Sequence, residues 1–377
     1  MCSEPDIVAM SVAEEHKEVR RRIVDLLEKI IRDAGDDMSK VNPPKKLVGR
    51  ARLDYVICLQ KEAEYSEALK VVEEAKEGLE DEVRKAQGSP SKGANAGNDF
   101  KMLRFDLAEA IERKGLILYE KRGMIEATKC FDQVLKMRQE MSSMPPTDAD
   151  GLAIAETLIN QGRVLFRSNR IEEAMTKYEE AFDLRVRCKG DVTLEMAKLY
   201  QHRSALKLAQ DDTDGSLKDL AESMKIICKL LGPDNIVAAD VWNLMGNTYK
   251  KKKDKQVSAA LPIFIHCFDC PVHLAHHLAR TATADHRAIF CCAQSLLEAK
   301  KYYEKSLETK KRVLGHNHPS VARTLTNLAG HYYKDHKQAQ KAVDLFENAL
   351  AINIDKYGEK SPHCKNILEE IAKIWKK

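Results

Sequence analysis

Along most of the chain, apolar residues recur at intervals of three and four positions, and Lys and Glu occupy many of the positions between them. The segments Ile171–Phe182, with the sequence IEEAMTKYEEAF, and Glu298–Leu307 show this pattern clearly. Because an α-helix has about 3.6 residues per turn, such spacing gathers the apolar side chains on one helix face. The pattern predicts an all-α protein whose helices each bury one face.

Small residues divide this helical pattern into repeats. Gly162, Ser204 and Gly246 follow one another at steps of 42 positions. A second set of small residues stands thirty positions before a later small residue. Two helices that cross closely need small side chains where they meet, so each repeat should contain two helices. The steps of thirty run from Ala174 to Ser204, from Ser216 to Gly246 and from Ala299 to Ala329.

The repeats share an end signal, in which Gly stops one helix and a nearby Pro starts the next. Gly adopts the left-handed cap conformation at low cost, and Pro suits the first turn of a helix. The segments Leu231–Ile236, Leu314–Ser320 and Tyr357–Pro362 carry this signal. The pattern predicts six helix-turn-helix repeats, at about 49–82, 108–141, 155–189, 197–231, 239–314 (interrupted) and 322–355, followed by a capping helix at Ser361–Trp375.

The predicted domain boundaries follow from these repeats and from shifts in composition. Residues 88–97, with the sequence GSPSKGANAG, indicate a flexible linker. Pro145 and Pro146 mark a second joint. The resulting division is an N-terminal helix in 1–40, a first helical pair in 45–85, a flexible linker in 86–104, repeats in 105–256, an irregular Cys/His-rich insertion in 257–297, and repeats with the capping helix in 298–377.

The segment Tyr302–Ala322, YYEKSLETKKRVLGHNHPSVA, followed by Thr326–Ala329, resembles the tetratricopeptide repeats of kinesin light chains. Nephrocystin-like proteins share this pattern. The resemblance covers most of residues 105–375 and is strongest after residue 297. It implies a right-handed solenoid whose concave groove holds an extended peptide, which in light chains belongs to a cargo or an adaptor. It also implies a motor adaptor that is cytoplasmic and associated with microtubules.

Kinesin light chains also carry a long coiled coil before the repeats, which binds the heavy chain. Here the apolar positions near the N-terminus form about two heptads, fewer than the three or four that indicate a coiled coil. They favour a helix that packs on the first repeat, so the usual element for heavy-chain binding is missing. The six apolar residues are Val19, Ile23, Leu26, Leu27, Ile30 and Ile31.

The stretch 257–297 interrupts the fifth repeat. The small residue expected near position 258 is found forty-one residues later, at Ala299, and the stretch holds four Cys, five His and no Lys. Three interpretations remain open: an unconstrained insertion such as a retained intron, a decayed repeat, and a zinc site. The candidate zinc ligands are Cys267, Cys270, His273, His276, His277, Cys291 and Cys292.

The first helices carry a face rich in Asn, Arg and Lys at fixed positions around the small residue of each repeat. Asn amides can bind a peptide backbone at both donor and acceptor, and Arg and Lys pair with carboxylates. This face is predicted to bind proteins through extended acidic motifs, and the alternative is an ordinary solvated surface. The predicted groove residues are Arg163, Arg167, Lys198, Gln201, Asn243, Asn247, Lys250, Arg323, Asn327 and Lys334. In the light-chain resemblance, the Asn-and-basic surface for acidic, tryptophan-containing motifs corresponds to Asn243, Asn247 and Asn327, with Arg323 nearby.

Composition narrows the function classes. The balance of 62 Lys and Arg against 58 Asp and Glu leaves a net charge of +4, which does not favour nucleic acid. We expect no membrane span and no signal peptide at Met1–Met10, and therefore free thiols in the cytoplasm. No phosphate-binding Gly loop, His-Glu-x-x-His or Gly-x-Ser-x-Gly occurs in the sequence, so neither an enzyme nor a cofactor is predicted.

The leading hypothesis is therefore a non-catalytic adaptor that resembles a kinesin light chain. A second hypothesis is a general scaffold or co-chaperone, in which Lys198, Asn243 and Asn247 contribute to a clamp for a C-terminal carboxylate. A third is a zinc protein built on residues 267–292.

Overall fold

The described part of the chain is helical. The computed structural model describes residues 17–26, 28–29, 45–61, 64–88, 96–142, 147–189, 192–264, 284–333 and 338–375. Across these residues the regular elements are helices and no strand occurs. The predicted all-α class is confirmed. The chain divides into two compact units, Met1–Gly190 (unit 1) and Asp191–Lys377 (unit 2).

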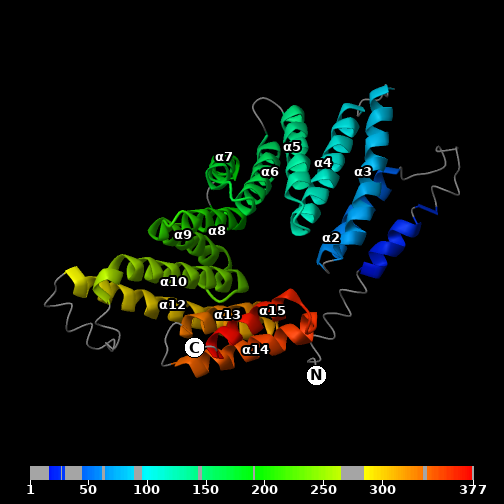
Figure 1. Cartoon of the computed structure of the whole chain (residues 1–377). Coiled ribbons are helices and arrows are strands. Elements are labelled where there is room, and N and C mark those ends of the chain that lie inside the picture. Colours follow the sequence, from blue (N-terminus) through cyan, green and yellow to red (C-terminus); the bar gives the residue numbers. More distant parts are fainter. Residues whose placement is uncertain are drawn as a thin grey trace. The chain divides into compact units, whose positions relative to one another are not determined.

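Unit 1 consists of helices that pack in consecutive pairs (Figure 1). Each pair has one predicted repeat within its span, which shows that the period of the small residues marks the helices correctly. The helices are α2 (Lys45–Lys61) with α3 (Tyr65–Gly88), α4 (Ala96–Glu120) with α5 (Met124–Met141), and α6 (Asp148–Arg167) with α7 (Ile171–Lys189).

Unit 2 repeats this arrangement and ends with one unpaired helix, as predicted for the capping helix. The helices are α8 (Leu194–Ala209) with α9 (Thr213–Leu231), α10 (Ile236–Phe264) with α12 (Ala284–Leu314), α13 (Pro319–Tyr332) with α14 (Ala339–Tyr357), and α15 (Pro362–Trp375). α15 packs on α14, and their apolar side chains share a core that includes Phe346 and Ile367.

The small residues lie where the two helices of a pair cross. At Gly162 of α6, an added Cβ would stand 2.5 Å from Cε1 of Tyr178 on α7. At Gly246 of α10, the corresponding distance to Cε1 of Tyr303 on α12 is 2.6 Å. A large ring on the second helix thus fills the space left by a missing side chain on the first. This close approach confirms the predicted role of the small residues in helix pairing.

The turns also repeat. Gly232, Gly315 and Gly358 end α9, α12 and α14 with φ values of +77°, +82° and +78°. This left-handed conformation strains any residue with a Cβ, so the predicted Gly caps are confirmed. A positive φ also occurs inside three pairs, in the turn that joins the first helix to the second. It falls on Arg122, Asn169 and Asp211, and each of them stands seven positions after the small residue of its repeat.

The N-terminal helical residues pack on the first pair, but they do so through Val24, which is not one of the six residues of the predicted apolar pattern. Val24 is buried in the same core cluster as Leu53 of α2. Arg20 pairs with Asp54 at 3.0 Å. Val19, Ile23 and Leu26 remain exposed, whereas Leu27, Ile30 and Ile31 lie outside the described residues.

Two predicted irregular stretches are shorter in the structure. α4 begins at Ala96, inside the predicted linker 86–104, because Leu103 and Leu107 extend its apolar face into the core of unit 1. α10 continues to Phe264 and α12 begins at Ala284, so helical backbone enters the predicted insertion from both sides. Residues 89–95 and 265–283 lie outside the described residues.

The zinc hypothesis falls on residues that the structure does not describe. Cys267, Cys270, His273, His276 and His277 are among the undescribed residues, as are the side chains of Cys291 and Cys292. Across the described residues, no group of His, Cys, Asp and Glu could hold a metal ion. In that same part of the chain, no helix is both long and apolar enough to cross a bilayer.

Candidate peptide-binding surface

In unit 2, the first helices of the pairs form a row. α13 contacts α10 where the Asn327 side-chain amide donates to Oδ1 of Asn243 at 3.1 Å, and where Arg323 pairs with Asp240 at 3.0 Å. α10 contacts α8 where the Lys251 ammonium donates to the carbonyl oxygen of Leu208 at 2.6 Å. The row α8, α10, α13 therefore brings together several of the predicted groove residues.

Three asparagines on α10 and α13, here called the asparagine row, are Asn243, Asn247 and Asn327. The hydroxyl of Tyr303 donates to Oδ1 of Asn247 at 2.7 Å, which leaves the two N–H groups of that amide for another acceptor. Asn243 is buried and its oxygen accepts from Asn327. Because these bonds fix the amide orientations, donors and acceptors are presented in set positions, as binding of a peptide backbone requires.

Arg323 belongs to a group of two cations and one carboxylate. Oδ1 of Asp240 accepts from Arg323 at 3.0 Å and also lies 2.9 Å from Nζ of Lys310. Lys310 is completely buried on α12 and also donates to Oγ1 of Thr324 at 3.1 Å. Burial lowers the pKa of Lys310 below its ordinary value, while Asp240 acts in the opposite direction. The group carries a net charge of +1, so Arg323 remains electropositive toward a ligand although it is paired.

The sequence interpretation missed Lys310. A signal for it existed, because Ala299, Tyr303, Ser306 and Lys310 follow one another at steps of four, three and four and are all buried. Lys310 therefore occupies a core position of α12, where a lysine needs a buried partner. The partner could not be read from the sequence, since Asp240 lies on another helix.

The other predicted residues of unit 2 have different surroundings. Lys198 is exposed on α8, whereas Gln201 donates to Oγ of Ser223 on α9 at 3.1 Å. Lys250 reaches α13, because a Cβ added at Gly330 would stand 3.0 Å from its Nζ. Lys334 lies outside the described residues.

In unit 1, Arg163 and Arg167 of α6 both stack on the ring of Tyr119 at the end of α4. The guanidinium carbons lie 4.7 Å and 4.1 Å from the ring centroid. Arg167 also donates to the carbonyl oxygen of Tyr119 at 2.8 Å. Such a contact stabilises a helix C-terminus, where the last carbonyls lack helical partners.

The Arg167 contact has an equivalent in unit 2. Arg167 and Lys251 each stand five positions after the small residue of their own repeat. Each donates to a backbone carbonyl on the first helix of the preceding repeat, and that carbonyl stands four positions after the small residue of that helix. The recurrence indicates that these cations join successive first helices. Arg163 and Arg167 thus have a structural role, beside any contact with a ligand.

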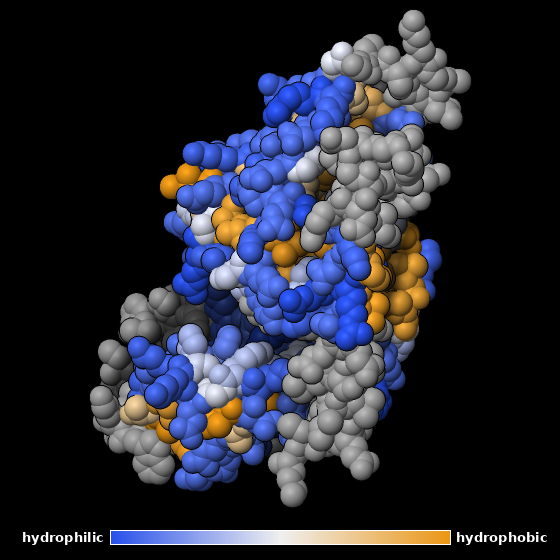
Figure 2. All heavy atoms as spheres, turned by 90° about the vertical axis from the view of Figure 1, so that its right-hand side faces the viewer, coloured by the Kyte–Doolittle hydropathy of each residue, from blue (hydrophilic) through white to orange (hydrophobic). Residues whose placement is uncertain are grey.

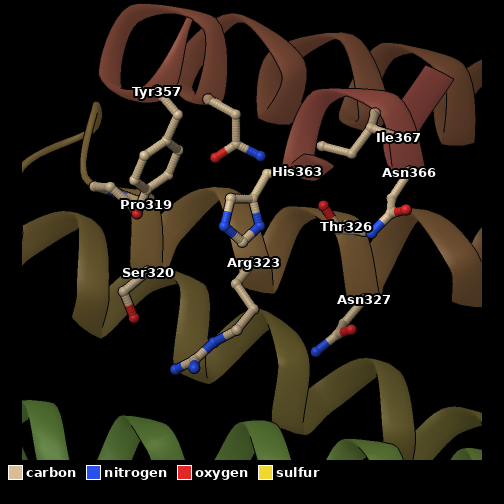
Figure 3. Close-up of a pocket in the computed structure, with 10 residues that line it drawn as sticks. Pro319, Ser320, Arg323, Thr326, Asn327, Tyr357, His363, Asn366 and Ile367 are labelled. Carbon is tan, nitrogen blue, oxygen red and sulfur yellow. The ribbon is translucent and has the colours of Figure 1, made fainter. Parts of the chain in front are cut away.

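A pocket lies beside Arg323, between α13, α14 and α15 (Figure 3). Sequence reasoning missed it, because its walls come from three helices. Its volume is about 390 Å³. The residues that line this pocket, here called the α15 pocket, are Pro319, Ser320, Arg323, Thr326, Asn327, Asn353, Tyr357, His363, Asn366 and Ile367.

A comparison with known protein families identifies the type of repeat in the C-terminal part of the chain. Residues 280–355 match the tetratricopeptide repeat family model. The matched stretch includes all of α12 and α13 and nearly all of α14. Helix pairs of this kind stack on their neighbours and form extended binding surfaces for proteins. No curated protein sequence matches the chain.

Several solved structures have a similar arrangement of helices at low sequence identity. BtubC (BKLC) from P. vanneervenii is 15% identical, with 74% of this chain and 92% of that chain covered and a TM-score of 0.49. A Podosopora anserina protein described as a kinesin light chain with nearly identical TPR-like repeats is 13% identical, with 67% and 96% covered and a TM-score of 0.44. NprR in complex with its cognate peptide NprX is 14% identical, with 97% and 89% covered and a TM-score of 0.48.

Proposed function

We propose that unit 2 binds an extended acidic peptide of a partner protein along the row α8, α10, α13, and that the chain acts as a non-catalytic adaptor. The observation that carries this proposal is the asparagine row, in which Tyr303 and the Asn243–Asn327 bond hold the amides in fixed orientations. An extended peptide exposes a donor and an acceptor at each residue, so amides on neighbouring helices can bind it without reading its side chains.

The charge of the same row supports an acidic partner. Arg323 is 62% exposed, and Lys310 offsets the carboxylate that pairs with it. Lys198 and Lys250 add positive charge on α8 and α10. Cations that are already held in position lose little side-chain entropy when a carboxylate arrives, which favours the bound state. On the face of the molecule drawn in Figure 2, hydrophilic residues cover most of the coloured surface and hydrophobic residues form smaller groups.

The cellular role that we propose is that of a kinesin-light-chain-like adaptor between a cargo and a motor. The support is the resemblance of Tyr302–Ala322 to light-chain repeats. A general scaffold or co-chaperone is the alternative, and a peptide that keeps its affinity after amidation of its C-terminus excludes the carboxylate clamp of that alternative.

The decisive experiment is a binding titration with two synthetic peptides, both acetylated and amidated, that alternate Gly with Glu or Gly with Gln. We expect the Glu peptide to bind more tightly. Arg323→Glu should weaken its binding about tenfold or more, since a charge-assisted hydrogen bond of about 1.5–3 kcal/mol is lost and repulsion replaces it.

The matched control is Arg312→Glu, because Arg312 is also an exposed arginine paired with an aspartate, Asp234 at 3.0 Å, but belongs to the second helix α12. The control should leave the affinity unchanged. Equal binding of the Glu and Gln peptides, or an equal loss in both variants, would rule out the proposed surface.

A further inference from the structure

The α15 pocket has the composition of a site for an anion. None of its ten lining residues is Asp or Glu. Arg323 and His363 contribute basic groups, and His363 projects from α15 toward Arg323 (Figure 3). The pocket also takes residues from the first turns of two helices, Pro319 and Ser320 of α13 and His363 of α15. Helix N-termini favour negative charge, so they act in the same direction as the side chains.

One largely buried side chain of the pocket has no partner in the protein. The residue Asn353 of α14 is 8% exposed and lines the pocket, and its side-chain amide makes no hydrogen bond within the described residues. Its polar atoms are open to the pocket and not sealed inside the core. A ligand with both a donor and an acceptor can pair with them, because an amide can donate and accept at once.

A further amide faces the same space, and Asn327 lies at its edge with its side chain turned toward Asn243 of α10. Asn366 projects from α15 toward α13, and Asn327 lines the wall formed by α13 (Figure 3). Asn327 also belongs to the asparagine row, so the pocket continues the proposed peptide-binding surface. The rings of Tyr357 and His363 pack at 4.9 Å between centroids and form a partly apolar wall.

The pocket has more room than a bare anion fills. A volume of about 390 Å³ corresponds to roughly a dozen water molecules at about 30 Å³ each. An amino-acid residue with its flanking peptide groups uses this space better than a small ion, and its peptide groups supply the partners that Asn353 and Asn366 need.

We propose that the α15 pocket binds one aspartate or glutamate residue of a peptide. The side-chain carboxylate contacts Arg323 and His363, and the flanking backbone amides bind Asn353 and Asn366. This inference rests on the proposed function in one respect, since it assigns the pocket as a subsite at one end of the same surface. Arg323 and His363 then select for an acidic side chain, and Asn353 and Asn366 fix the place of that residue in the peptide.

The test uses probes too small to span the row of first helices. They are N-acetyl-glutamate N-methylamide and its glutamine counterpart, and the readout is the imidazole proton signals of His363 in NMR titrations of the full chain. We expect saturable shifts with the glutamate probe only. Asn366→Asp should weaken binding at least tenfold, because it places a carboxylate in the pocket, and Asn366 is exposed, so the fold should tolerate the change.

The matched control is Asn348→Asp, since Asn348 is an exposed asparagine of α14 that does not line the pocket. Binding that the control preserves and Asn366→Asp removes supports the assignment. Equal shifts with both probes, or glutamate binding that Asn366→Asp leaves intact, overturns it. Equal shifts with N-acetyl-glycine, whose only carboxylate is terminal, also overturn the assignment to a side chain.

The two proposals can fail separately. If the pocket binds the glutamate probe while Arg312→Glu and Arg323→Glu affect the longer Glu peptide equally, the pocket stands and the peptide surface does not. If the longer peptide discriminates between those variants but the small probe produces no shift, the surface stands and the pocket assignment is wrong.

Discussion

Replacing Lys310 with Met tests whether a residue that no ligand can touch controls the preference for acidic peptides. Lys310 is completely buried, lies 2.9 Å from Asp240 and neutralises the carboxylate that also binds Arg323. Without Lys310, Asp240 and Arg323 neutralise each other, and the net charge of the group falls from +1 to 0. Lys310→Met should therefore weaken binding of the Glu peptide and leave the Gln peptide unaffected.

The magnitude follows from the charge removed. One unit charge about 8 Å from a ligand carboxylate, at an effective dielectric constant of about 40, contributes about 1 kcal/mol. This corresponds to a change of about fivefold in Kd. Asp240→Asn should have the opposite effect, a gain of about fivefold, because it removes the negative charge and leaves both cations.

Stability must be measured beside affinity. Removing one member of a buried ion pair can cost about 3–5 kcal/mol, but here Asp240 is 41% exposed and keeps Arg323, and the desolvated ammonium is removed as well. We therefore expect a loss of no more than about 2 kcal/mol in urea unfolding. The assay is a fluorescence anisotropy titration of each folded variant at low ionic strength. Unchanged selectivity for Glu over Gln in both Lys310→Met and Asp240→Asn would refute the electrostatic argument.

Two further predictions concern stability. Gly162→Ala should lower the free energy of unfolding by up to about 2 kcal/mol, because crowding of Tyr178 costs about 1–3 kcal/mol and the better helix propensity of Ala returns about 1 kcal/mol. The control is Gly78→Ala, whose Cβ would meet nothing within 4 Å. In chemical denaturation, this control should stabilise α3 by about 0.5–1 kcal/mol. Tyr55, whose hydroxyl donates to Glu67 at 3.0 Å, has a pKa raised to about 12 by burial and by that carboxylate. The unfolded chain loses this proton first, so stability should fall by up to about 2.7 kcal/mol as the pH rises from 10 to about 12, at about 1.36 kcal/mol per unit. Tyr55→Phe should lack that part of the pH dependence in urea titrations, and an identical alkaline loss in both proteins would contradict the assignment.

Much of the local structure could be predicted from the sequence, for reasons that the contacts now explain. Gly162 and Gly246 revealed the helix crossings because only a missing side chain lets Tyr178 and Tyr303 approach so closely. Gly315 revealed a helix end because its φ of +82° is costly for other residues. These signals are local, since each depends on one residue and its own backbone. The start of α4 at Ala96 was harder to predict from the sequence, because packing of Leu103 and Leu107 extends the helix and no cap in the sequence marks its start.

Only part of the candidate site could be predicted from the sequence. The period of the repeat placed Asn243, Asn247 and Asn327 on one face, and the structure brings them together on α10 and α13. The period could not tell which cations are engaged within the chain. Arg167 holds the end of α4, and Arg323 shares Asp240 with a lysine from a different helix.

The helix pairs, their turns and the polar face of the first helices can be predicted from the amino-acid sequence, because they depend on backbone preference and on a period that repeats along the chain. The charge around Arg323 and the α15 pocket could not be predicted in this way, because they arise from contacts between helices. Lys310 and Asp240 are seventy positions apart, and the pocket draws its walls from α13, α14 and α15. Partners this distant in sequence are chosen by the packing of helices against one another, for which no single segment carries a signal.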